Sequence, residues 1–114
     1  MSKSTVEILR GAREVLERNG WNQGWFFRDD DPGANPAECA VCLRGALNLS
    51  AGAEHPGSPA ACGDALMAVN DALPERWRGL IAGWNDERGR TVEEVYALLD
   101  RAIELAEGGV SDGR

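Results

Sequence analysis

The chain has 114 residues and a formal net charge of −7, with 43% hydrophobic and 27% charged residues. This balance is typical of one globular domain, so we expect a single domain over residues 1–114 with an ordered core at about 4–107 and a frayed C-terminal tail. The negative charge and the lack of a basic run disfavour nucleic acid and anionic membranes, which leaves protein as the expected partner.

Targeting and origin are addressed by two further features of the composition. No segment resembles a signal peptide or an apolar membrane span, which favours a cytoplasmic location. Lys3 is the only lysine among 12 basic residues, and Ala and Gly are abundant. This bias indicates a GC-rich genome, such as that of an actinobacterium or of a phage that infects one.

Helix-start signals punctuate the chain. Ser4 and Glu7 have capping-box spacing and open a helix that ends at Gly20, and Asn35-Pro36-Ala37-Glu38 opens a second helix that runs to about Ser50. Ser58-Pro59 opens a third helix that ends at Pro74, Pro74-Glu75-Arg76 opens a shorter fourth, and Thr91 with Glu94 opens a fifth that stops at Gly108. Apolar residues recur along these segments at helical spacing, which predicts one buried stripe per helix.

The segment after the first helix has a different character. Trp25, Phe26 and Phe27 favour a strand, and Gly24 interrupts any helix there. We therefore predict a mainly α fold, with four to five short helices and a small aromatic β ribbon after helix 1. In the second helix, Gly45 lies on a face of small residues, which predicts the close approach of another backbone.

The cysteines and the one histidine could be a chemical site or part of the core. Cys39, Cys42, His55 and Cys62 have the residue types of a Cys3His zinc site. A redox-active C-x-x-C pair and a Cys42 nucleophile with His55 are further alternatives. Cys39 and Cys42 fall inside the predicted second helix, and Cys62 falls on an apolar stripe. Buried structural thiols are therefore the favoured interpretation, and no cofactor is expected. The acidic run at residues 29–31 lacks calcium-loop spacing and is interpreted as a solvated turn.

The aromatic residues also allow two interpretations. The favoured interpretation is that they form one layer of the core. However, side chains of three consecutive aromatics in a strand point to both faces, so at least one can face outward beside acidic residues. The sequence contains no Walker loop, H-E-x-x-H or G-x-S-x-G motif, which leans against an enzyme.

Three short motifs, in this order, resemble those of a family of small actinobacterial and actinophage proteins, the domain of unknown function 6197. They are Gly20-Trp21-Asn22-Gln23-Gly24, Cys42-Leu43-Arg44-Gly45-Ala46-Leu47, and Trp84-Asn85-Asp86. The resemblance covers roughly residues 5–106 and implies no activity, cofactor or partner. It draws attention to Gln23, Asn85 and Asp86, for which helix capping and turn closure are the favoured role.

Three functional hypotheses follow. The first is a non-enzymatic interaction or regulatory protein that uses outward-facing aromatics. The second is a small enzyme or ligand-binding protein, which requires the side chains of Gln23, Cys42, Asn85 and Asp86 to converge on one pocket. The third is the zinc-stabilised module. The candidate binding residues are Trp21, Gln23, Trp25, Phe27, Cys42, Asn85 and Asp86.

Overall fold

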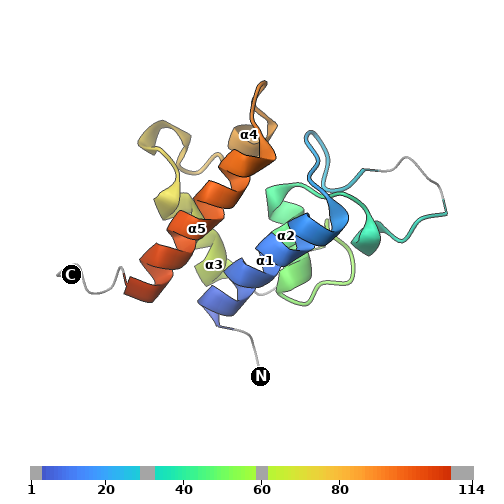
Figure 1. Cartoon of the computed structure of the whole chain (residues 1–114), viewed down its shortest axis with the longest axis horizontal. Helices are drawn as coiled ribbons and strands as arrows, with labels where there is room; N and C mark the ends of the chain where they lie inside the picture. Colours follow the sequence, from blue (N-terminus) through green and yellow to red (C-terminus); the bar gives the residue numbers. More distant parts are fainter. Residues whose placement is uncertain (1–3, 29–32, 59–61, 109–114) are drawn as a thin grey trace.

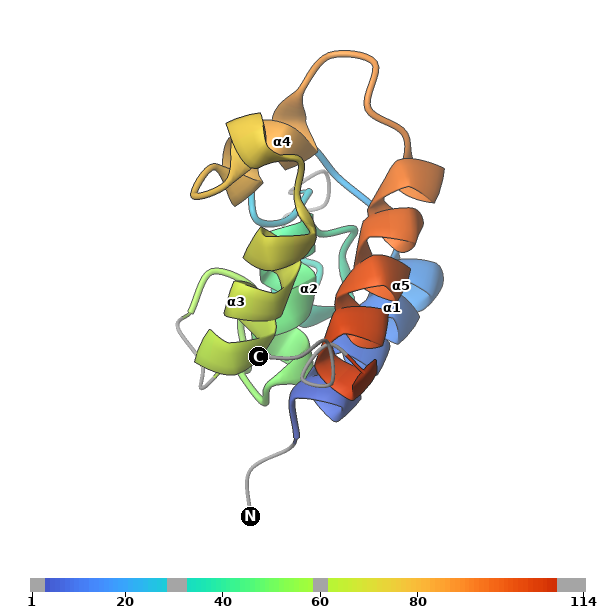
Figure 2. The ribbon, with the colours of Figure 1, turned by 90° about the vertical axis from the view of Figure 1, so that its left-hand side faces the viewer.

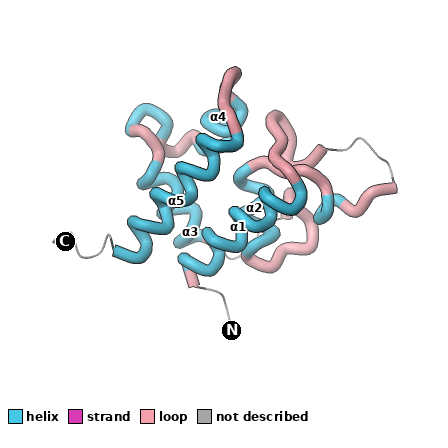
Figure 3. The backbone as a smooth tube through the Cα atoms, in the orientation of Figure 1, coloured by secondary structure: helices cyan, strands magenta, loops and turns pink. Residues whose placement is uncertain are grey.

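The computed structural model describes residues 4–28, 33–58 and 62–108, and within them it is mainly helical (Figure 3). The acidic run at residues 29–31, the start of the predicted third helix at Pro59 and the C-terminal tail lie outside these residues. The elements are α1 (Thr5–Asn19), the 3-10 helix η1 (Pro36–Glu38), α2 (Leu43–Ser50), α3 (Gly63–Ala72), the 3-10 helix η2 (Glu75–Trp77), α4 (Ile81–Asp86) and α5 (Val92–Gly108).

The two longest helices begin where the capping boxes predicted. The Ser4 hydroxyl accepts the Glu7 N–H at 3.1 Å, and the Glu7 carboxylate accepts the Ser4 N–H at 2.8 Å. At the start of α5, the Thr91 hydroxyl accepts the Glu94 N–H at 3.2 Å, and the Glu94 carboxylate accepts the Thr91 N–H at 2.9 Å. Both boxes satisfy N–H groups that the helix itself leaves unpaired.

The helices pack in a simple arrangement. Helix α1 packs against both α2 and α5, and α1 and α5 lie side by side (Figures 1 and 2). Helix α5 also packs against α3, and the short α4 packs against α2. No helix in the described part of the chain is long and apolar enough to cross a membrane.

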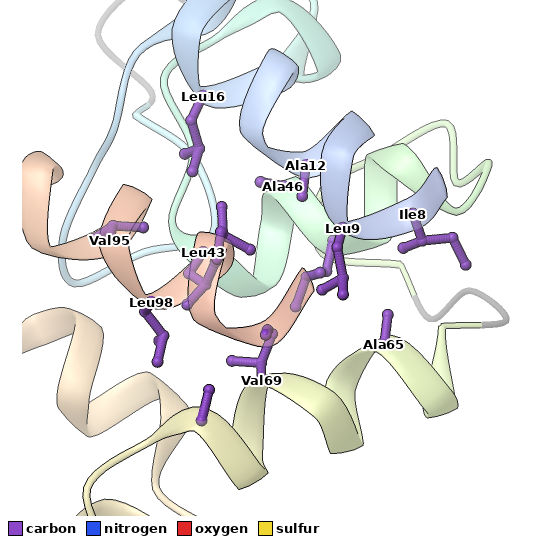
Figure 4. Close-up of a cluster of buried hydrophobic side chains, with 14 of the residues drawn as sticks. Ile8, Leu9, Ala12, Leu16, Leu43, Ala46, Ala65, Val69, Val95 and Leu98 are labelled. Atoms are coloured by element: carbon purple, nitrogen blue, oxygen red, sulfur yellow. The ribbon is translucent and has the colours of Figure 1, made fainter. Parts of the chain in front are cut away.

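The predicted apolar stripes meet in one core. Side chains from four helices point toward one another in Figure 4, among them Leu9 of α1, Leu43 of α2, Val69 of α3 and Val95 of α5. All four are fully buried. Each such side chain contributes roughly 1.5–3 kcal/mol to stability, so the stripes account for the fold.

The predicted β ribbon is wrong. The described residues form no strand, and residues 21–28, which we call the aromatic loop, make only two isolated bridges, both to Val41. Gly24 adopts a positive φ of 90° and turns the segment back on itself. Both arms of the loop therefore meet the same residue, Val41, and neither runs along a partner strand.

The predicted second helix is two separate elements. Asn35 caps as expected, with its Oδ1 accepting the Ala37 N–H at 3.1 Å, but only the 3-10 turn η1 follows. The Val41 N–H donates to Gly20 O and the Val41 carbonyl accepts from Asn22 N. These bonds occupy backbone groups that a continuing helix would need, so α2 begins only after Cys42.

The predicted fourth helix is also divided. Gly79 adopts a positive φ of 81°, which separates the 3-10 turn η2 from α4. Trp84 nevertheless reaches the core as the apolar spacing indicated, whereas Leu80 remains exposed. This break places Gly79 and the start of α4 beside α2 and α3, where they line a surface pocket described below.

Candidate functional site

A single buried amide joins the aromatic loop, α2 and α4. The side chain of Asn85 is 1% exposed. Its Oδ1 accepts the Trp21 indole N–H at 2.7 Å and the Leu43 N–H at 3.1 Å. Its Nδ2 donates to Asn22 O at 3.2 Å and to Asp86 Oδ1 at 2.8 Å. All four hydrogen-bonding positions of the amide are occupied, so Asn85 fixes three segments and has none left for a ligand.

Gln23 and Asp86 complete this junction. The Gln23 Nε2 donates to the carbonyls of Asn85 and Glu87, both at 3.0 Å. Asp86 Oδ1 also accepts the Gly24 N–H at 2.8 Å. Gln23, Asn85 and Asp86 are therefore brought together at this junction. The capping interpretation is supported as well, because these bonds close the end of α4 and the turn at Gly24.

The backbone of the aromatic loop is held in place while two of its aromatic side chains, Trp25 and Phe26, are exposed. Asn22 Nδ2 donates to Trp25 O at 2.9 Å, and the Cys42 N–H donates to Phe26 O at 3.2 Å. A Cβ at Gly45 would lie only 2.8 Å from Phe26 O, which confirms the predicted close backbone approach. Despite these contacts, the side chain of Trp25 is 77% exposed and that of Phe26 is 43% exposed.

The other two aromatics of the loop have inward contacts. Trp21 is half-buried and donates to Asn85. Phe27 is half-buried and meets the ring of His55 edge to face, with centroids 5.1 Å apart. The loop therefore divides its four aromatics between packing and exposure. The favoured interpretation of a single aromatic core layer does not hold for Trp25 and Phe26.

A pocket of about 350 Å³ opens between the aromatic loop, α2 and α4. It is lined by Gly24, Trp25, Phe26, Cys42, Arg44, Ala82, Asn85 and Asp86. Its volume lies at the lower end of the range of small-molecule sites. Of the predicted binding residues, Trp25, Cys42, Asn85 and Asp86 line it, whereas Trp21, Gln23 and Phe27 do not.

The thiol of Cys42 is kept protonated in this pocket. Burial raises its pKa, and the charge of Asp86 adds to the effect, although backbone N–H groups at the start of α2 oppose it. The Gly45 N–H donates to Cys42 Sγ at 3.3 Å, so the sulfur caps α2. His55 does not line the pocket. These features disfavour a Cys42 nucleophile, which needs an adjacent base or a lowered pKa.

Arg44 is the charged residue of the pocket that is absent from the predicted binding residues, as are Gly24, Phe26 and Ala82. Its Nε atom is buried and has no hydrogen-bond partner among the described residues. Leaving a buried guanidinium nitrogen unpaired is costly, so such an atom calls for an explanation. The signal in the sequence was weak, because Arg44 looked like one more surface arginine on a predicted longer helix.

The Cys/His set does not form a metal site. Cys39, Cys42, His55 and Cys62 all lie in the described part of the chain, and no three His, Cys, Asp or Glu side chains in that part could hold a metal ion together. Each of the four has another contact. Cys39 donates to Asn35 O, Cys62 contacts Asn48 Oδ1, and His55 Nδ1 accepts the Gly57 N–H.

Comparison with known proteins supports the resemblance found in the sequence. The model of a family of unknown function (DUF6197) matches residues 1–105. The chain therefore belongs to this family. No curated protein and no solved structure matches it significantly.

Proposed function

We propose that this protein is a non-enzymatic interaction module that binds a partner protein through the aromatic loop and the pocket beside it. One observation carries the proposal: the loop backbone is fixed by hydrogen bonds on both sides, yet Trp25 and Phe26 remain exposed. Exposed tryptophan beside an apolar pocket is typical of an interface, since aromatic anchors supply much of the binding energy there.

The state of the polar groups also supports binding over catalysis. The Asn85 amide has no free position, the Gln23 amide donates to two backbone carbonyls, and burial raises the pKa of Cys42. A catalytic set needs a base or nucleophile that is within reach and suitably ionised. The net charge of −7 supports a protein partner over nucleic acid.

The proposal is tested by cross-linking in the cells that naturally express the chain. A photoreactive benzoylphenylalanine replaces Trp25, whose exposed side chain has no role in the core. We expect one discrete adduct with another protein upon irradiation. The matched control places the same group at Glu104, an exposed position on α5 that does not line the pocket beside the aromatic loop. Equal adducts at both positions, or none at position 25, would contradict the proposal.

A small ligand is the second candidate, because Cys42, Asn85 and Asp86 converge on one pocket. Asp86 Oδ1 already accepts two hydrogen bonds, so a ligand would bind through apolar contacts, Arg44 and the second carboxylate oxygen of Asp86. Native mass spectrometry of protein purified from its own cells distinguishes the two candidates. A bound small molecule that is lost in Arg44→Gln would favour the ligand, whereas ligand-free protein would favour the partner.

A further inference from the structure

Arg44 lines two pockets. One is the pocket beside the aromatic loop. The other, of about 300 Å³, is lined by Arg44, Leu66, Met67, Asn70, Gly79 and Ile81. The two pockets also meet along α4, because Ile81 lines one and Ala82 the other. We call this pair of pockets, which share Arg44, the α4 groove.

Exposed apolar side chains gather along the α4 groove. Among the described residues, the exposed large apolar side chains are Trp25, Phe26, Met67 and Leu80. The first two line the first pocket and Met67 lines the second. Leu80 is 53% exposed, and its two neighbours in the sequence, Gly79 and Ile81, line the second pocket. An apolar surface gathered at one site indicates an interface, whereas scattered apolar side chains do not.

The charges of the groove indicate which partner fits. No described residue forms an ion pair or hydrogen bond with the Arg44 side chain. A guanidinium binds a carboxylate through two parallel hydrogen bonds, and it does so best where water is excluded. Asp86 lines only the first pocket, so it repels a carboxylate there and favours its placement at Arg44. The net charge of −7 further disfavours a segment with many acidic residues.

We propose that the α4 groove binds a segment of a partner protein that carries a single Asp or Glu between two large apolar side chains. The carboxylate pairs with Arg44, and one apolar side chain enters each pocket. This inference rests on the proposed function and specifies its partner. The carboxylate gives the buried Arg44 Nε a partner, and the apolar side chains cover Trp25 and Phe26 in the first pocket and Met67 in the second.

The test selects a display library of random 12-residue peptides against the full chain and against Arg44→Glu. We expect peptides selected on the wild type to carry one acidic residue between two apolar residues. Replacing that acid by Gln in a synthetic peptide should weaken binding at least about tenfold, as measured by fluorescence polarisation. Arg44→Glu should instead prefer the same peptides with Lys at that position. Arg10→Glu, an exposed arginine that lines neither pocket, is the matched control and should keep the wild-type preference.

Circular dichroism establishes that each variant folds. If Arg44→Glu does not, Arg44→Gln replaces it and should lose the preference for Asp over Asn. Peptides that do not bind Trp25→Ala but bind the Arg44 variants as they bind the wild type would overturn this inference and leave the proposed function standing. Failure to select any peptide that depends on Trp25 would overturn both. A Trp25-dependent dimer of the chain, seen by sedimentation, would replace the partner segment with a second copy and so also overturn the inference.

Discussion

The α1–α5 face and the α4 groove use arginine in opposite ways. On the α1–α5 face, Arg10 lies 2.5 Å from Glu107 and Arg13 lies 2.6 Å from Asp100, so each cation pairs with a carboxylate of the neighbouring helix. In the groove, Arg44 has no such partner and lies among exposed apolar side chains. The first arrangement pairs each arginine within the chain, whereas the second leaves the buried Arg44 Nε without a hydrogen-bond partner among the described residues.

The largest expected effect comes from removing the amide that holds the groove. Asn85→Ala leaves the Trp21 indole, the Leu43 N–H and the Asn22 carbonyl without their partner. Unpaired buried groups cost about 1–3 kcal/mol each, so we expect a loss of about 3–4 kcal/mol in the free energy of unfolding measured in urea. Gln23→Ala, which removes an exposed amide, should cost about 1 kcal/mol or less. Equal losses would contradict the central role of Asn85.

The close approach of the aromatic loop to α2 gives the second prediction. A Cβ at position 45 would collide with Phe26 O, 2.8 Å away, and with Pro56 Cβ at 3.2 Å. We expect Gly45→Ala to destabilise the chain by about 1–3 kcal/mol despite the better helix propensity of alanine. Gly63→Ala in α3 is the control, because its Cβ meets nothing within 4 Å, and its thermal midpoint should change little. A stabilised Gly45→Ala would show that the loop is free to move away.

Substituting one paired arginine, Arg13, and the unpaired Arg44 tests the difference between the α1–α5 face and the α4 groove directly. Arg13→Gln removes the pair with Asp100 and the stacking on Tyr96, where the guanidinium carbon lies 4.7 Å from the ring centroid. We expect a loss of about 0.5–1 kcal/mol that shrinks in 1 M salt. Arg44→Gln should cost no stability, since the wild-type side chain has no partner to lose. Urea titrations of both variants at two salt concentrations test this. A larger loss of unfolding free energy for Arg44→Gln than for Arg13→Gln would refute the difference between the α1–α5 face and the α4 groove.

The smallest expected effect concerns pH. Burial raises the pKa of Cys42, so the folded chain holds this proton to higher pH than the unfolded chain does. The resulting stability is complete below the ordinary thiol pKa of about 8.5 and declines as pH rises from there toward the raised value. Cys42→Ala should flatten this alkaline decline in urea midpoints measured under reducing conditions. Cys39→Ala should leave it in place, and the opposite pattern would assign the decline to Cys39.

Local signals predicted the fold well where a helix depends on its own residues. The capping boxes at Ser4 and Thr91 and the apolar stripes placed α1 and α5 correctly. Prediction failed at Val41, where strand-like bonds to Gly20 and Asn22 interrupt the second helix. The Asn35 cap looks the same in sequence whether the predicted helix over residues 36–50 follows it or only the three residues of η1. The contacts of Val41 with Gly20 and Asn22, about 20 residues away, decide between the two.

The candidate site was predicted in part. The motifs named Gln23, Cys42, Asn85 and Asp86, and the structure brings these residues together. Arg44 was missed because its importance depends on the absence of a partner, which no sequence pattern records. Leu80 was missed because an apolar residue on a helical stripe resembles a core residue until the packing is known.

The aromatic loop is held by the side chains of Trp21 and Gln23 and by its main chain. In the main chain, Asn85 binds the carbonyl of Asn22, Asp86 binds the N–H of Gly24, and the carbonyl of Phe26 accepts the Cys42 N–H. These bonds do not depend on which side chains stand at positions 25 and 26. Substitutions at positions 25 and 26 should therefore change the exposed surface of the aromatic loop while these backbone bonds keep its course unchanged.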